Sequence, residues 1–198
     1  MKDSFYIKIV FFIRKKISCV YVLVGFFLTF SGCTVSESNN KPIKSLSGGE
    51  TGEIYFESSN PYSYNHILDG TDNDEKVTVF GILKIPKATT EKVGAIVFVH
   101  GSGGWRKSHE HWLEAFNKMG IATFRLSSFE PRGISRTVGS QTEVTSSMMT
   151  ADAYNALKLL NTHPRIDKDR IGIMGGSKGG AVSIVSAWEP VRRAIVSG

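Results

Sequence analysis

The chain has 198 residues, of which 41% are hydrophobic and 21% are charged, so it has enough apolar side chains to form the core of one domain. Its formal net charge is +6, but five of its 24 basic side chains and one of its 18 acidic ones lie in the first 32 residues, which leaves +2 for the rest. That near-neutral remainder gives no reason to expect a nucleic-acid partner.

The first 33 residues form a separate unit. Five basic side chains precede an apolar run over Ile17–Phe30, and the small-residue sequence Ser31-Gly32-Cys33 follows. This pattern resembles a bacterial lipoprotein signal. The resemblance implies that residues 1–32 are removed, that Cys33 is lipidated, and that the protein is held at a membrane of the bacterial envelope, facing the periplasm or the exterior. An uncleaved membrane anchor is the alternative, because the run is close to the shortest length that spans a bilayer.

A flexible tether is predicted after Cys33. Residues 34–52 are rich in Ser, Gly, Asn, Lys and Glu and show no apolar period, whereas residues 53–198 carry the patterns of a folded domain. Cys19 and Cys33 are the two cysteines, and both belong to the signal. A mature domain would therefore have no thiol to pair, and we expect no disulfide.

Two strands are predicted in the first half of the domain. Lys76–Ile85 alternates in places and ends at Pro86, as a strand of an antiparallel pair does. Ala95–Val99 is a continuous apolar run, which is typical of a buried strand. The glycine-rich sequence His100-Gly-Ser-Gly-Gly104 follows this second strand directly, so we expect it at the strand's carboxyl end.

Two amphipathic helices are predicted in the middle of the chain, over Glu110–Met119 and Ser146–Asn161, with a strand over Ile121–Leu126 between them. Each helix carries an apolar stripe that we expect in the core. The stripes consist of Trp112, Leu113, Phe116 and Met119 in the first helix, and of Met149, Ala153, Ala156, Leu157 and Leu160 in the second.

The segment Ser127–Glu143 is predicted to be a loop along the carboxyl ends of the strands, where open α/β sheets bind ligands. Arg132 in this loop is a candidate to hold a substrate carboxylate through two hydrogen bonds. The alternative is a contact of Arg132 with Glu130 or Asp152 that orders the loop. Trp105, just after the glycine-rich sequence, is expected either to form a pocket wall or to pack internally.

The most specific motif is Gly175-Gly-Ser-Lys-Gly179, between the apolar run Ile171–Met174 and a predicted helix over Lys178–Trp188. In the G-x-S-x-G nucleophile elbow, a serine occupies strained backbone between strand and helix, and the glycines let neighbouring chain approach closely. Ser177 is therefore the candidate nucleophile. The alternative is a nucleotide-binding α/β protein, but the sequence matches neither a full G-x-G-x-x-G context nor G-x-x-x-x-G-K-[ST].

Both glycine motifs together give the domain a recognisable pattern: residues 76–198 resemble the front part of an α/β hydrolase, in particular the dienelactone-hydrolase-like group. The stretches that carry the resemblance are His100–Gly104, Phe129-Glu-Pro-Arg-Gly133, Asp152–Leu157 and His163–Gly180. The resemblance implies a mostly parallel sheet with flanking helices and a small ester or lactone substrate. The sequence itself shows no metal-ligand spacing and no dinucleotide fingerprint, so we expect neither metal nor cofactor.

The resemblance also assigns an oxyanion hole. The backbone N–H groups of Ser102, Gly103 and Lys178 would stabilise the negative charge that develops on the substrate oxygen. His100 would shape the loop that carries the first two donors and border the pocket. Such a hydrolase would act on ester or lactone carbonyls through an acyl-enzyme on Ser177.

The usual partners of the nucleophile are not found where this fold places them. The triad acid and base follow the serine in sequence, but all five histidines precede Ser177, and the only acid after it is Glu189, which we expect to be a solvated helix-end charge. We expect the sheet to stop after the elbow and one further strand, Ala194–Ser197.

Several functional readings remain open at this point. The first is the serine hydrolase described above. The second is a catalytically inactive, truncated lipoprotein or a binding module on the same scaffold. Two further alternatives would restore the base: a substitute from among His100, His109 and His111, or a base supplied by a separate chain.

Overall fold

The computed structural model describes residues 40–71, 75–87 and 91–197. Every element described below belongs to one compact unit, which begins at residue 39. The predicted signal peptide, the lipidation site Cys33 and the start of the tether lie outside the described residues. Within the described ranges, no helix is both long enough and apolar enough to cross a bilayer.

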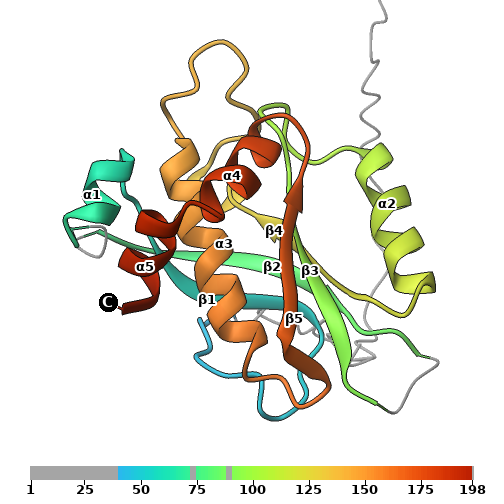
Figure 1. The fold of residues 1–198 in the computed structure, drawn as a ribbon. Coiled ribbons are helices and arrows are strands. Elements are labelled where there is room, and N and C mark those ends of the chain that lie inside the picture. Colours follow the sequence, from blue (N-terminus) through green and yellow to red (C-terminus); the bar gives the residue numbers. More distant parts are fainter. Residues whose placement is uncertain (1–39, 72–74, 88–90, 198) are drawn as a thin grey trace, which may run out of the picture. The chain divides into compact units, whose positions relative to one another are not determined.

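Five strands form one sheet in the order β1-β2-β4-β3-β5 (Figure 1). β3 runs parallel to β4 and β5, whereas β1 pairs antiparallel with β2, and β2 antiparallel with β4. The strands predicted from the apolar runs in the first half of the chain are confirmed, including the antiparallel one. The strands are β1 (Gly52–Ser59), β2 (Lys76–Lys84), β3 (Val93–Val99), β4 (Ala122–Ser127) and β5 (Ile166–Gly175).

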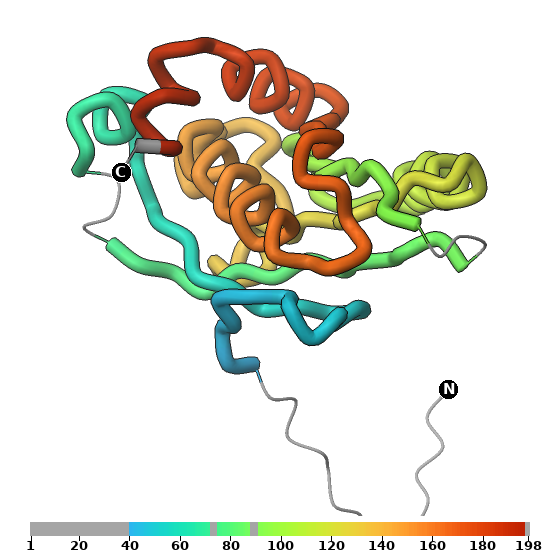
Figure 2. The backbone as a smooth tube through the Cα atoms, turned by 60° about the horizontal axis from the view of Figure 1, so that its bottom comes forward, coloured from blue at the N-terminus to red at the C-terminus, as the bar shows by residue number. Residues whose placement is uncertain are grey.

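Helices flank this sheet, which confirms the predicted α/β architecture. α3 and α4 lie side by side and pack on β3 and β5, and α5 follows next to α1 (Figures 1 and 2). α2 stands apart from that layer and packs mainly against β4. The helices are α1 (Tyr64–Leu68), α2 (Lys107–Lys118), α3 (Ser146–Leu160), α4 (Lys178–Ser186) and α5 (Glu189–Ser197), with a 3-10 turn, η1, at Glu130–Arg132.

The main core lies between the sheet and α3. Met149, Ala153, Ala156 and Leu160 are all completely buried, and they share one cluster with side chains of every strand. The predicted inner face of α3 is therefore confirmed. Burial of this apolar surface contributes a favourable free energy of about 25 cal/mol per Å², and this is the main contribution that holds the helix on the sheet.

The predicted core stripe of α2 is wrong at two of its four positions. Leu113 is buried and Phe116 is half-buried, but Trp112 and Met119 are 53% and 71% exposed. Because α2 packs mainly against β4, only the narrow strip of the helix that faces this strand is covered.

β5 is also less buried than its apolar run predicts. Ile171 and Ile173 are half-buried, and Met174 is 37% exposed. β5 pairs with β3 on one side and is the last strand of the sheet order. An edge position leaves one flank of the strand open, which the local sequence does not reveal.

The strand predicted at Ala194–Ser197 is wrong, because this segment is the last turn of α5. Val191 and Ile195, four residues apart, are buried against Ile67 and Tyr154. A spacing of four is the signature of a helix, and the short apolar run concealed it. No strand of the described sheet therefore follows the elbow.

Candidate active site

The predicted elbow is present between β5 and α4. Ser177 has φ 54° and ψ −120°, a conformation that non-glycine residues rarely adopt. A β-carbon on Gly175 would overlap the carbonyl oxygen of Val99, and one on Gly179 would overlap the carbonyl groups of Val99 and His100. The two motif glycines are therefore required because the elbow packs directly on the end of β3.

Ser177 is exposed, and its hydroxyl does not cap α4. The side chain borders a pocket of about 410 Å³ that is also lined by Gly101, Ser102, Gly103 and Val138. A β-carbon built on Gly101 would lie 3.2 Å from the Ser177 β-carbon and 3.8 Å from its Oγ. The two glycine motifs, which lie far apart in the sequence, thus meet at one pocket.

The glycine-rich sequence after β3 forms a tight turn. The Gly104 N–H donates to the Gly101 carbonyl over 3.0 Å, and Gly104 has φ 71°, in the left-handed region that favours glycine. Ser102 and Gly103 lie within this turn and line the Ser177 pocket, and Lys178 begins α4 beside the serine. Two of the three predicted oxyanion donors, Ser102 and Gly103, therefore line the pocket, and the third, Lys178, directly follows the serine that borders it.

His100 is buried beneath this turn at 1% exposure. Its Nδ1 lies 2.9 Å from the Gly101 carbonyl oxygen, and its ring meets Phe129 edge-on at 4.3 Å. Burial lowers the pKa of the His100 ring, although the hydrogen bond to Gly101 opposes that shift. These contacts are those of a residue that shapes the loop.

Trp105 serves both roles that were open for it. Its Nε1 donates to the Leu126 carbonyl over 3.0 Å, and the Arg125 guanidinium lies 4.7 Å from the ring centroid. The side chain also lines a second pocket, of about 460 Å³, together with His100, Phe129 and Glu130. This aromatic pocket adjoins the Ser177 pocket at Gly104, which lines both.

The other histidines differ in their relation to Ser177. His109 lines the Ser177 pocket, but its Nδ1 accepts a hydrogen bond from the Arg106 N–H at 3.2 Å. Burial lowers the pKa of His109, and the nearby Arg106 charge adds to the shift. His111 is exposed, and its ring meets that of Trp112 edge-on, with 6.4 Å between the centroids. Among the described residues, no histidine or carboxylate forms a hydrogen bond with Ser177 Oγ.

Arg132 does not face a ligand. Its guanidinium binds Asp152 through two hydrogen bonds of 2.8 and 3.0 Å and also donates to Asn60, Ser128 and Ser59. The Arg132 side chain is 8% exposed and that of Asp152 is 0%. All five donors of the guanidinium have protein acceptors. The structure therefore favours the alternative in which Arg132 orders its loop through Asp152.

The Lys178 side chain is a feature that sequence reasoning missed, because only its backbone N–H was considered. It is 8% exposed, and its Nζ donates to the Val144 carbonyl. The sequence did contain a signal for this burial, namely a lysine inside the small-residue run Gly175–Gly180. At such a tight turn the long aliphatic part of the lysine side chain must lie along a neighbouring segment.

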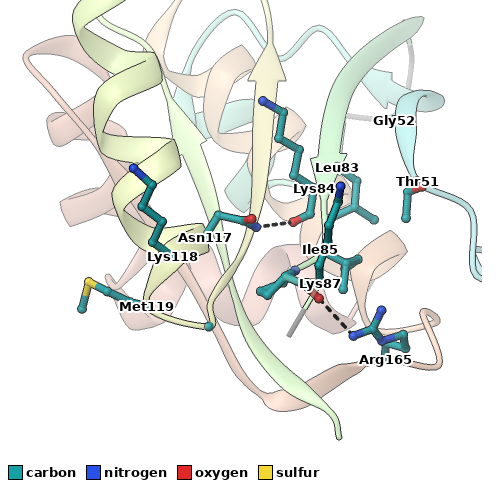
Figure 3. A pocket seen from close by; sticks show the side chains of 12 residues that line it. Thr51, Gly52, Leu83, Lys84, Ile85, Lys87, Asn117, Lys118, Met119 and Arg165 are labelled. Carbon is teal, nitrogen blue, oxygen red and sulfur yellow. Dashed lines mark hydrogen bonds between the residues drawn. The ribbon is translucent and has the colours of Figure 1, made fainter. Parts of the chain in front are cut away.

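A larger pocket, of about 950 Å³, lies at the amino ends of the parallel strands (Figure 3). Lys84, Lys87, Lys118 and Arg165 contribute its charged side chains. None of its lining residues is a serine, a histidine or a carboxylate, and Ser177 lies at the opposite end of the sheet. We therefore place the candidate active site at the elbow. In the described part of the chain, no three metal-ligating side chains are grouped.

Parts of the chain are similar to known proteins. Residues 147–197 match the family model described as acetyl xylan esterase (AXE1). No curated protein matches the chain. Est1E from Butyrivibrio proteoclasticus, solved with ferulic acid bound, is 21% identical with a TM-score of 0.49, over 60% of this chain and 46% of that one. Dienelactone hydrolase from Anabaena variabilis is 21% identical with a TM-score of 0.46, over 70% and 58% of the two chains.

The chain spans about half the length of these solved structures. The sheet order, the elbow at Ser177 and the flanking helices define an α/β-hydrolase fold. The α/β-hydrolase architecture predicted from the sequence is confirmed, and the match of residues 147–197 to an esterase model agrees with the predicted resemblance.

Proposed function

We propose that the protein is a serine hydrolase that acts on ester or lactone carbonyls, with Ser177 as its nucleophile. The observation that carries this proposal is the backbone of Ser177, φ 54° and ψ −120°, which holds an exposed hydroxyl over a glycine-lined pocket. Strained backbone of this kind concentrates at functional sites, and the G-x-S-x-G elbow uses it to present a nucleophile.

In the proposed reaction, Ser177 Oγ bonds to the carbonyl carbon while its proton passes to a base, which is either a substitute among His100, His109 and His111 or a group from a separate chain. The N–H groups of Ser102, Gly103 and Lys178 stabilise the negative oxygen of the tetrahedral intermediate. The carbon–oxygen bond to the leaving alcohol then breaks, and the alcohol takes the proton. Water attacks the acyl-enzyme by the same steps in reverse and releases the acid.

The size of the acyl group that is transferred to Ser177 is part of the proposal. The AXE1 family model is named for an esterase that removes acetyl groups, and a small acyl group fits a pocket of about 410 Å³. Hydrolysis of p-nitrophenyl acetate by the wild type, Ser177→Ala and Ser183→Ala tests it. Ser183 lies on the same helix, but its hydroxyl donates to the Gly179 carbonyl at 2.9 Å. We expect activity in the wild type and Ser183→Ala only; equal activity in Ser177→Ala would contradict the proposal.

An inactive scaffold or binding module is the second candidate. It is favoured by one observation: in the described ranges, Ser177 Oγ has no hydrogen bond to a histidine or carboxylate that could take its proton. This candidate predicts no hydrolysis by folded wild-type protein, together with saturable binding of a boronic acid or an ester analogue. Hydrolysis that depends on Ser177 would exclude it.

We also propose that the protein is a lipoprotein of the bacterial envelope, attached through Cys33. The support is the sequence pattern of residues 1–33 alone. Expression in bacteria with an alkyne-tagged fatty acid should label the wild type and leave Cys33→Ser unlabelled. Equal labelling of both, or of neither, would contradict this assignment.

A further inference from the structure

Lys178 occupies a position that does not suit a cation. It is the first residue of α4, where the helix dipole disfavours positive charge, and it is 8% exposed. Burial lowers the pKa of its ammonium. Partial removal of a charge from water costs several kcal/mol unless hydrogen bonds replace the lost water, so the surroundings of this side chain must provide acceptors.

The acceptors come from one segment, residues 137–144. Lys178 Nζ donates to the Val144 carbonyl, to the Gln141 carbonyl at 3.4 Å and to Thr137 Oγ1 at 3.4 Å. Three acceptors match the three N–H donors of a lysine. In the described part of the chain Lys178 forms no salt bridge. Its hydrogen bonds thus hold a loop, and the negative charge of Glu143 in the same segment acts on it without a direct salt bridge.

The same segment is bonded to the glycine turn on its other side. The Thr137 N–H donates to the Ser102 carbonyl at 2.8 Å, and Ser102 Oγ donates to Gln141 Oε1 at 3.0 Å. Gln141 adopts φ 60°, which a non-glycine residue holds only when its surroundings require it. Segment 137–144 therefore connects the start of α4 to the turn that contains Ser102 and Gly103.

We propose that the Lys178 ammonium is a positioning group for the Ser177 site. Through segment 137–144 it fixes the Ser102 and Gly103 amides relative to its own backbone N–H, and it holds Val138 in the pocket wall. Oxyanion donors act only when they are held in place before the charge develops. The catalytic part of this inference rests on the proposed function, whereas the ordering of segment 137–144 does not.

The test compares Lys178→Met, Lys178→Gln and the matched control Lys118→Met, which removes an exposed lysine from α2. Hydrogen exchange of residues 137–144 and the rate of Ser177 modification by a fluorophosphonate are both measured. We expect exchange in that segment to rise by at least about tenfold in Lys178→Met and the rate of modification to fall by a similar factor. Lys178→Gln keeps amide donors and should show a smaller change, and Lys118→Met none.

The other possible results also decide whether Lys178 is a positioning group. Unchanged exchange of segment 137–144 in a folded Lys178→Met variant overturns the inference, and so does slower modification without faster exchange. If Lys178→Met does not fold, Lys178→Gln gives the measurement, with unchanged exchange again the contrary result. If the folded wild type is not modified at all, the proposed function fails, and hydrogen exchange alone decides the role of Lys178.

Discussion

Ser177 combines positive φ with an exposed hydroxyl, and its neighbours explain how both persist. Sparsely populated backbone of this kind costs about 1–3 kcal/mol. The strain is maintained because Gly175 and Gly179 pack against the carbonyl groups at the end of β3, so the elbow cannot relax away from the strand. At the scale of single residues, the packing glycines are therefore as necessary to the site as the serine.

A methyl group at Gly179 should destabilise the fold. The added β-carbon would overlap the Val99 carbonyl and lie 2.8 Å from the His100 oxygen, and both are backbone atoms that cannot move aside easily. We expect Gly179→Ala to lower the free energy of unfolding by about 1–3 kcal/mol in urea denaturation. Gly172→Ala, on β5, is the matched control, because a β-carbon there meets nothing within 4 Å. Equal effects of the two changes would refute the packing argument.

The Arg132–Asp152 pair should be important for stability. Removing one partner leaves a buried charge unpaired, and we expect Arg132→Met to lower the free energy of unfolding by about 3–5 kcal/mol. Arg192→Met breaks an exposed pair with Glu189 and should change it little. Thermal and urea unfolding of both variants would check this. A small effect at Arg132 together with loss of substrate binding would restore the ligand role considered for it.

At the scale of elements, the sequence predicts the elements that consecutive residues determine by their own backbone preferences. The strand–glycine–helix arrangement around Ser177 and the turn after β3 are encoded by consecutive residues, and both were predicted. α5 was mistaken for a strand because Ala194–Ser197 is too short to show a period. The exposed face of α2 was also missed, since the number of strands that cover a helix is a property of the assembled sheet.

The packing of one face of α5 can be tested with two identical substitutions. Val191 is completely buried, whereas Val196 is 60% exposed. We expect Val191→Ala to lower the free energy of unfolding by about 1.5–2 kcal/mol, since two buried methyl-sized groups are lost, and Val196→Ala to leave it nearly unchanged. A strand would also place these two positions on opposite faces, because they are five residues apart, so the pair tests which face of α5 is packed. Similar losses at both positions would contradict the burial of Val191 alone.

At the scale of the whole molecule, the site depends on contacts between distant segments. Arg132 and Asp152 lie 20 positions apart, and Lys178 lies 34 positions from Val144. The sequence could suggest the first contact as an alternative, because opposite charges were visible. It could not suggest the contact of Lys178 with Val144, because every residue has a backbone carbonyl and the residue type does not show which one accepts a hydrogen bond. Tertiary packing thus determines which distant segments the side chains of these local motifs contact.

Acid should destabilise the whole fold. Burial lowers the pKa of His100, His109 and His163 below the usual value of 6.5. Below pH 6.5 the unfolded chain therefore binds more protons than the folded one, and stability falls as the pH drops. We expect a lower melting temperature at pH 5.5 than at pH 7.5.

Two histidine variants isolate this effect from that of the carboxylates. His163 is 2% exposed and lies outside the proposed site, whereas His66 is exposed. His163→Gln should show a smaller loss of melting temperature between pH 7.5 and 5.5 than the wild type, and His66→Gln should show the same loss. A pH dependence unaffected by His163→Gln would contradict the contribution of that residue.

The most direct test of the central claim is mass spectrometry of the folded protein after treatment with a fluorophosphonate. Such a probe reports an activated serine without requiring knowledge of the natural ester. Our account predicts one adduct, on the peptide that contains Ser177, which Ser177→Ala abolishes and Ser183→Ala retains. A folded wild-type protein that gains no adduct, or an adduct that persists in Ser177→Ala, would contradict Ser177 as the nucleophile.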